Sequence, residues 1–245
     1  MNDGALLKAR DAQLHRLSEL FEGRHGEHVF VLNGLKGKGR SDLYAEPERW
    51  LAEALDDLAG KADALRDIVV FRPLSINPLP YGVHFVDTLF GARVYELHGE
   101  SDNWQAEYLR CPVGHLREPN LATHPSSTLA RRMAMAFVTA GTAVPLFGPP
   151  VLSSPLNIAL NLYGQSFLEA MLCEPESAHR DLRVITDTII RLHRWFQESI
   201  PLEQLQMIET GGRVQPKGHG QLCGCSTHLL SARQYSDFVA PFDQK

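Results

Sequence analysis

The sequence alternates between short runs rich in β-branched and aromatic residues and longer stretches with apolar residues at helical spacing. The first kind of segment predicts strands and the second predicts amphipathic helices, and the connections between them are short. Strands that alternate with helices form a mainly parallel sheet, because each helix carries the chain back to start the next strand in the same direction. The pattern therefore predicts an α/β protein, wound either as a barrel or as a doubly wound sheet.

Capping residues, prolines and glycines mark where these helices start and stop. Ser154 followed by Pro155 is typical of a helix start, because serine accepts a hydrogen bond from a free backbone N–H and proline has no N–H to leave free. Helices are expected at 7–23, 47–58, from 126 or 127 to 141, at 155–164 and at 175–200. Strands are expected at 28–34, within 67–78, after a short helix and a glycine within 82–99, within 103–113 and within 143–148. The segment 35–42 is expected to be a charged loop.

Length and composition set the class of molecule. The chain has 245 residues, of which 44% are hydrophobic and 22% are charged, ordinary values for a globular protein with one large core. No linker-like stretch and no internal repeat divides the sequence, so we expect a single domain over 1–245. The formal net charge is −5 and the Lys and Arg residues are scattered, so no nucleic-acid partner is expected.

Neither a membrane partner nor secretion is expected. The most apolar window, 133–152, is broken by Gly141, Pro145 and the Pro149-Pro150 pair before it reaches the ~20 residues that a membrane span needs. The N-terminus has no basic segment followed by a long apolar one, so no secretory signal is predicted. Four cysteines do not make a disulfide framework here, which favours reduced thiols and a cytoplasmic location.

Three stretches share their order and spacing with one protein family. They are 153–196, with a Pro-Leu helix followed by an acidic-Pro-Glu helix start, the segment "STHLLSARQYSDFVAPF" at 226–242 and, more loosely, "EPERWLAEALDDL" at 46–58. Together they resemble the uroporphyrinogen decarboxylase superfamily, which contains haem-pathway decarboxylases and methylcobamide (corrinoid) methyltransferases. The resemblance spans about 35–242 and implies a (β/α)8 TIM-type barrel with its site at the carboxyl ends of the strands.

The resemblance also implies that the barrel continues beyond this sequence. In the family, further strand–helix units follow the helix that corresponds to 232–242. We therefore expect the chain to be the N-terminal portion of a barrel, C-terminally incomplete and inactive on its own. An incomplete barrel exposes sheet edges and core residues, which predicts either a covering partner or instability. Sequencing the coding DNA beyond the codon for Lys245 tests this expectation.

Two reactions and one non-catalytic role are compatible with the resemblance. Decarboxylases of the family bind a carboxylate-rich tetrapyrrole with an Arg-rich stretch and a Phe-Ser-Asp triplet, but the segments here read "GLKGKGRSD" and "NPLPYGVHF". We therefore expect the methyltransferase branch, which moves a methyl group between a corrinoid carrier protein and a small substrate. Its zinc is held by a His-x-Cys pair and a later Cys, expected beyond residue 245. The alternatives are a tetrapyrrole decarboxylase and a truncated, non-catalytic binding partner.

Polar residues in apolar surroundings are the candidates for the site. His84 and Asp87 lie three residues apart and share a helical face, which suits a general acid/base pair and equally an internal hydrogen bond. Arg72 at a strand end, and Asn157 and Tyr163 on the helix after Pro155, are candidates for substrate binding. Each of these five residues also suits a buried core or capping role.

A group of cysteines and histidines near the C-terminus offers an alternative zinc site. Cys223, Cys225, His219 and His228 have side chains of the type that binds zinc. Cys223 and Cys225 are separated by one residue, and successive side chains of a strand point to opposite sides. This spacing is closer than that of a usual zinc-binding pair. We therefore expect structural cysteines and no metal within this chain.

Overall fold

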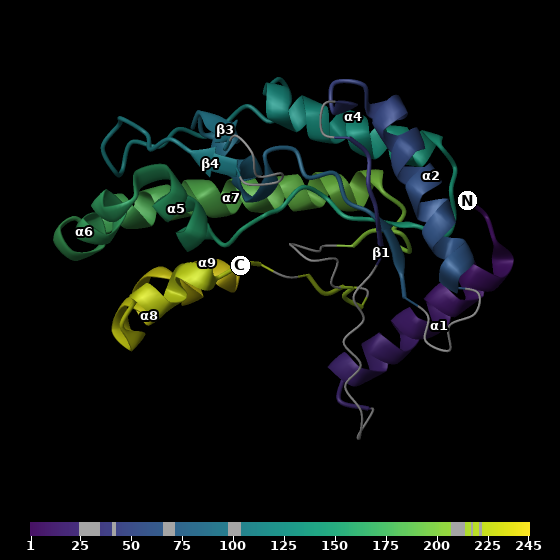
Figure 1. Ribbon diagram of the computed structural model, residues 1–245. Coiled ribbons are helices and arrows are strands. Elements are labelled where there is room, and N and C mark those ends of the chain that lie inside the picture. The colour runs from purple at the N-terminus through teal and green to yellow at the C-terminus, as the bar shows by residue number, and fades with distance from the viewer. Residues whose placement is uncertain are drawn as a thin grey trace. The chain divides into compact units, whose positions relative to one another are not determined.

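Helices and strands are interspersed along the chain as far as residue 147, as the sequence predicts, and the elements described after that residue are helical (Figure 1). The structure is a computed structural model that describes residues 1–24, 35–40, 43–65, 72–97, 104–206, 214–216, 218–220 and 222–245. The strand expected at 28–34 lies outside these residues. Internal contacts divide the chain into unit 1 (Met1–Pro78, Leu129–Pro150 and Phe196–Gln221) and unit 2 (Leu79–Thr128, Val151–Trp195 and Leu222–Lys245).

Unit 1 is built on a parallel sheet. Strands β1 (Leu35–Gly37), β2 (Leu74–Ile76) and β5 (Leu146–Phe147) pair side by side in that order, and Phe147 makes a further parallel bridge to Leu205. The prediction of an α/β fold with a parallel sheet is therefore confirmed. Within the described ranges no strand closes this sheet into a barrel.

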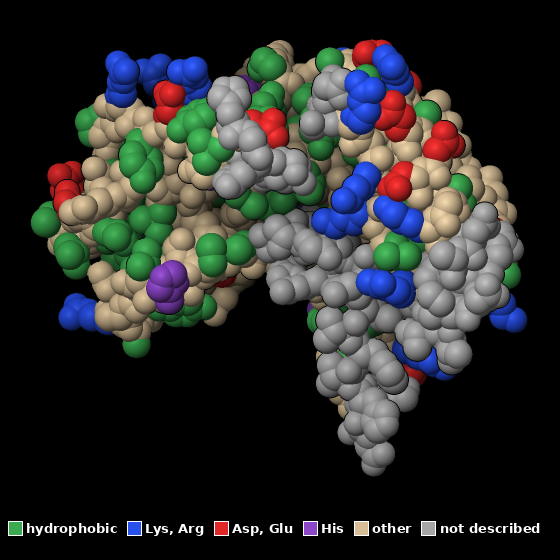
Figure 2. Space-filling view, viewed as in Figure 1, with side chains coloured by type: hydrophobic (Ala, Val, Ile, Leu, Met, Phe, Trp, Pro, Cys, Tyr) green, Lys and Arg blue, Asp and Glu red, His purple; other side chains and the backbone are tan. Residues whose placement is uncertain are grey.

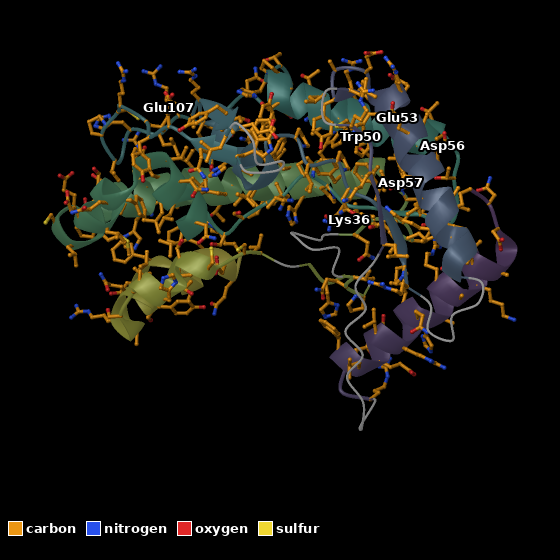
Figure 3. The ribbon with its side chains drawn as sticks, in the orientation of Figure 1. Lys36, Trp50, Glu53, Asp56, Asp57 and Glu107 are labelled. Atoms are coloured by element: carbon orange, nitrogen blue, oxygen red, sulfur yellow. The ribbon has the colours of Figure 1, made fainter. Side chains whose placement is uncertain are left out.

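Strand β1 lies where the sequence predicts a charged loop. Lys and Gly have low strand propensity, but contacts with helix α2 (Pro47–Leu65) override it. The backbone N–H of Lys38 donates to Asp57 Oδ2 at 2.7 Å, and Lys61 Nζ donates to the carbonyl oxygen of Lys36 at 2.6 Å. Figure 3 labels Lys36 and Asp57 on these two elements. The loop prediction was wrong because it considered local propensity and not the packing of the helix.

Helix α1 (Gly4–Phe21) covers the amino end of β5. The Arg10 side chain is only 2% exposed, pairs with Asp11 at 2.8 Å and donates to the carbonyl oxygens of Ala143 and Val144, which precede β5. A cavity of about 470 Å³ separates α1 from residues 202–206. The amino end of the strands in such folds serves stability, and ligands bind at the other end. We therefore do not assign this cavity to the functional site.

Unit 2 is mainly helical. Its elements are η2 (Gly82–His84), α3 (Phe85–Leu89), the antiparallel ribbon β3 (Val94–Glu96) and β4 (Trp104–Ala106), α5 (Pro155–Tyr163), α6 (Gln165–Cys173), η3 (Cys225–Leu229), α8 (Ala232–Phe238) and α9 (Ala240–Asp243). The residues of α4 (Pro125–Thr139) and α7 (Pro175–Ser199) are divided between the units. The expected cap of α5 is confirmed, since Ser154 Oγ accepts from the backbone N–H of Asn157.

The surface matches the scattered charge of the sequence. On the face shown in Figure 2, Lys and Arg side chains lie interspersed with Asp and Glu side chains. No helix in the described part of the chain is long and apolar enough to cross a membrane.

His193 on α7 makes the stability of the fold sensitive to acid. Burial lowers the pKa of His193 from 6.5 to about 4, because the interior disfavours the charged ring. The unfolded chain therefore binds a proton below pH 6.5 that the folded chain does not bind until about pH 4. The contribution to stability is complete above pH 6.5 and is lost as the pH falls from 6.5 to 4.

We expect this loss to be about 2 kcal/mol, allowing for the partial exposure of the ring. Urea unfolding of the wild type and of His193→Gln, each at neutral and at acidic pH, measures it. The variant should lose less stability on acidification than the wild type. Equal losses in the two proteins would contradict the assignment to His193.

Candidate functional site

A tight turn before helix α3 positions His84. Tyr81 has a left-handed backbone conformation with φ 63°, and Gly82 follows with φ 54°. The backbone N–H of His84 donates to the carbonyl oxygen of Tyr81 at 3.0 Å. A Cβ on Gly82 would lie 2.8 Å from Cδ1 of Trp104, so the turn requires glycine for both its conformation and its contact. The turn η2 thus leads directly into α3.

His84 and Asp87 meet in a short hydrogen bond. His84 Nδ1 lies 2.6 Å from Asp87 Oδ2, and Asn161 Nδ2 on α5 donates to the same oxygen at 2.9 Å. The Asp87 side chain is 0% exposed and that of His84 is 13% exposed. Asp87 Oδ1 is also buried and has no hydrogen-bond partner among the described residues. We call His84, Asp87 and Asn161 the His84 network.

Burial controls the charge of Asp87. It raises the pKa of this carboxyl, because the interior disfavours the anion, while the hydrogen bonds from His84 and Asn161 act in the opposite direction. An unpartnered buried polar atom costs roughly 1–3 kcal/mol, and such an atom calls for an explanation, such as a catalytic role, strain, or a bound water or ion. The His84 network therefore has the chemistry of a site that takes up and releases a proton.

The sequence analysis missed Asn161. The available signal was its position four residues after Asn157 in the apolar helix "PLNIALNLYG". Two amide side chains at this spacing in an apolar stretch each need hydrogen-bond partners. Their partners come from distant parts of the chain, so the two asparagines cannot be told apart from the sequence alone.

Asn157 holds the segment that leads into η3. Its Nδ2 donates to the carbonyl oxygen of Cys223 at 2.9 Å and to Cys225 Sγ at 3.2 Å. Its Oδ1 accepts from the backbone N–H of Ser226 at 3.0 Å. These polar contacts are with the protein itself, which favours a positioning role over the predicted substrate binding.

Tyr163 belongs to a second buried network. Its Oη donates to Asp181 Oδ2 at 2.7 Å, and Asp181 also accepts from the backbone N–H groups of Gly114 at 2.7 Å and Leu116 at 3.1 Å. Burial, and then Asp181, raise the pKa of Tyr163, because both disfavour the phenolate. Tyr163 is therefore held neutral, and its contacts favour a core role over substrate binding.

The remaining predicted residue, Arg72, belongs to unit 1. It is exposed and lies two residues before the start of β2, whereas the other four candidates belong to unit 2. Among the five, a hydrogen bond joins His84 to Asp87, while Asn157 and Tyr163 have partners of their own. The substrate-binding role of Arg72 stays a prediction.

The residues of the alternative zinc site are not brought together. In the described ranges, no group of three or more His, Cys, Asp or Glu residues is placed to hold a metal. His219 packs edge-on against Phe21 with ring centroids 4.9 Å apart, and His228 Nδ1 is hydrogen-bonded to the carbonyl oxygen of Cys225. Neither Cys223 nor Cys225 forms a disulfide in the part of the chain described. The side chains face different partners, so they do not fit a zinc ion.

The carboxyl end of the unit 1 sheet holds polar groups that the sequence analysis also missed. Ser75 in β2 and Asn77 just after it are buried, and Ser75 Oγ and Asn77 Oδ1 lack hydrogen-bond partners in the part of the chain that is described. Gly148, just after β5, lies against Asn77, since a Cβ there would be 1.8 Å from Asn77 Nδ2. Barrels and open α/β sheets bind ligands at this end of the strands. These residues are a second candidate for substrate contact.

The fold defines the chain as an α/β protein with a parallel sheet, and a comparison with solved structures finds a similar fold. The chain is similar to a methyltransferase from Methanosarcina mazei, with a TM-score of 0.55 and 14% sequence identity, over 91% of this chain. It spans 62% of the length of that protein. No family model matches the chain, and no curated protein matches it in sequence. At this identity the likeness shows the fold, and membership of the uroporphyrinogen decarboxylase superfamily stays a prediction.

Proposed function

We propose that this chain is part of a methyltransferase that moves a methyl group between a corrinoid carrier protein and a small substrate. The observation that carries the proposal is the structural likeness to a methyltransferase over 91% of the chain. The sequence supports it, because the segments "GLKGKGRSD" and "NPLPYGVHF" contain neither the Arg-rich stretch nor the Phe-Ser-Asp triplet of the decarboxylases. A carboxylate-rich tetrapyrrole needs several guanidinium partners, and these two segments contain a single arginine, Arg40.

The proposed architecture is the TIM-type barrel that the resemblance implies. Strands β1, β2 and β5 and the bridge at Leu205 follow one another in chain order and run parallel, as successive strands of a barrel do. In this proposal, Ser75 and Asn77 contact the substrate from the carboxyl end of the strands.

The described residues do not fit the zinc of corrinoid methyltransferases. Because no group of three suitable side chains gathers in the part of the chain described, we assign no step to a metal held there. The zinc ligands are expected beyond residue 245, and the methylcorrinoid is a substrate brought by the carrier protein.

Methyl transfer from methylcobalamin to small thiols tests the proposal. The protein encoded by the complete reading frame is mixed with methylcobalamin and 2-mercaptoethanol, and the loss of methylcobalamin is followed by absorbance. We expect repeated turnover that depends on the protein. A surface thiol of the protein can itself accept one methyl group, so a variant with serine at the exposed Cys111, Cys173 and Cys225 serves as the control.

Turnover that persists in the serine variant supports methyl transfer. Methyl uptake that stops at one equivalent per cysteine, or disappears in the serine variant, contradicts it. Release of carbon dioxide from uroporphyrinogen under the same conditions would favour the decarboxylase instead.

A further inference from the structure

The hydrogen bonds of the His84 network define where its proton lies. Asn161 Nδ2 donates to Asp87 Oδ2, so this oxygen acts as an acceptor. His84 Nδ1 lies 2.6 Å from the same oxygen, a distance typical of a charge-assisted hydrogen bond with a proton between the two atoms. A proton on Asp87 Oδ1 would be buried without an acceptor among the described residues. When the pair holds one proton, that proton therefore lies on the Nδ1 side of the ring.

We propose that His84 is the proton-accepting residue of a small-molecule site, with Asp87 and Asn161 as its positioning residues. With the proton on Nδ1, the lone pair of the neutral ring is on Nε2. In the proposed step, the X–H bond of a protic ligand group, a hydroxyl or a thiol, breaks. Its proton moves to Nε2, its electron pair stays on X, and Asp87 stabilises the resulting imidazolium.

The contrast with Asp181 shows why this network is more than a structural contact. Asp181 is also buried, but its two oxygens together accept three hydrogen bonds, from Gly114, Leu116 and Tyr163. In Asp87, both hydrogen bonds, from His84 and Asn161, are made to Oδ2, and Oδ1 has no partner in the described part of the chain. A carboxylate used only for packing would be satisfied in the manner of Asp181.

The exposure of His84 fits the same role. Its side chain keeps 13% of its surface exposed, while its partner Asp87 keeps none. Its hydrogen bond to Asp87 is made through Nδ1 and does not involve Nε2. Part of the His84 side chain is therefore open to solvent, while the carboxylate behind it is shielded from water. This assignment does not depend on methyl transfer and stands or falls separately from it.

Nitrogen NMR of histidine-labelled protein measures the tautomer of His84 directly. In the wild type we expect the neutral ring to carry its proton on Nδ1. In Asp87→Asn, the amide oxygen that takes the place of Oδ2 accepts from both Asn161 and His84 without a negative charge, so the preference for a proton on Nδ1 weakens. The tautomer ratio should change about tenfold, as expected when a charge-assisted hydrogen bond is replaced by a neutral one.

Two variants on helix α5 separate positioning from general packing. Asn161→Leu removes the donor that fixes Asp87 Oδ2 and should mix the two tautomers of His84. Asn157→Leu is the matched control one helical turn away, because Asn157 contacts the segment before η3 and not Asp87. We expect it to leave the His84 tautomer unchanged.

Acylation by diethyl pyrocarbonate tests the reactivity of Nε2. The reagent acylates an accessible imidazole nitrogen with a free lone pair, so mass spectrometry should find His84 modified. The rate at His84 should fall about tenfold in Asp87→Asn, in step with the tautomer ratio. A wild-type ring that carries its proton on Nε2, or equal rates at His84 in the two proteins, would overturn the proposal. If Asp87→Asn does not fold, the wild-type spectrum decides.

Discussion

Asp181→Asn is expected to destabilise unit 2 by about 3 kcal/mol. The wild-type carboxylate is 0% exposed and accepts hydrogen bonds from two backbone N–H groups, of Gly114 and Leu116, and from Tyr163 Oη. An asparagine keeps one acceptor oxygen and turns an N–H₂ group toward a donor. At least one buried backbone N–H then loses its partner, and the loop that contains Gly114 and Leu116 loses its attachment to α7. Urea unfolding followed by circular dichroism measures the change.

Tyr163→Phe is the control for this prediction. It removes one of the three donors to Asp181 and leaves both backbone hydrogen bonds in place. We expect a loss of about 1 kcal/mol, a typical value for a single hydrogen bond. If Asp181→Asn lowers the free energy of unfolding by no more than Tyr163→Phe does, the hydrogen bonds from Gly114 and Leu116 to Asp181 do not stabilise unit 2 as predicted.

Gly37→Val is expected to destabilise unit 1 by about 3 kcal/mol. A Cβ at Gly37 would lie 2.3 Å from the carbonyl oxygen of Ala54 in α2 and 2.8 Å from Cδ1 of Ile76 in β2. The first of these atoms is backbone and cannot rotate away, so β1 and α2 have to separate. Denaturant unfolding of the variant and the wild type gives the difference.

Gly60→Ala is the matched control on the partner helix. A Cβ at Gly60 meets nothing within 4 Å, and alanine has the higher helix propensity. We therefore expect Gly60→Ala to stabilise α2 by roughly 0.5–1 kcal/mol. A harmless Gly37→Val would show that β1 does not pack against α2 as described.

The candidate site could be predicted from the sequence only in part. His84 and Asp87 were recognisable because they are three residues apart, and one helical turn brings such residues together in any helix. Asn161 was not, because it reaches Asp87 across 74 residues of sequence. The same holds for Asn77, whose importance depends on Gly148 at the end of a neighbouring strand.

The sequence by itself determined the local elements and the class of fold. The cap of α5 at Ser154 and the start of α7 at Pro175 depend on residues within about one helical turn of each other. The alternation of strands and helices that predicts a parallel sheet depends on the period of the hydrophobic residues. These effects act over short separations, so a single sequence contains them.

Only the tertiary structure decided which polar groups are satisfied and which have no hydrogen-bond partner among the described residues. Asp181 was unremarkable in the sequence, yet its backbone donors come from 65 and 67 residues away. Strand β1 formed from a segment with loop-like composition, because helix α2 supplied hydrogen bonds and a close contact at Gly37. Long-range hydrogen bonds and backbone contacts depend on which segments meet in space, and local periodicity carries no information about that meeting.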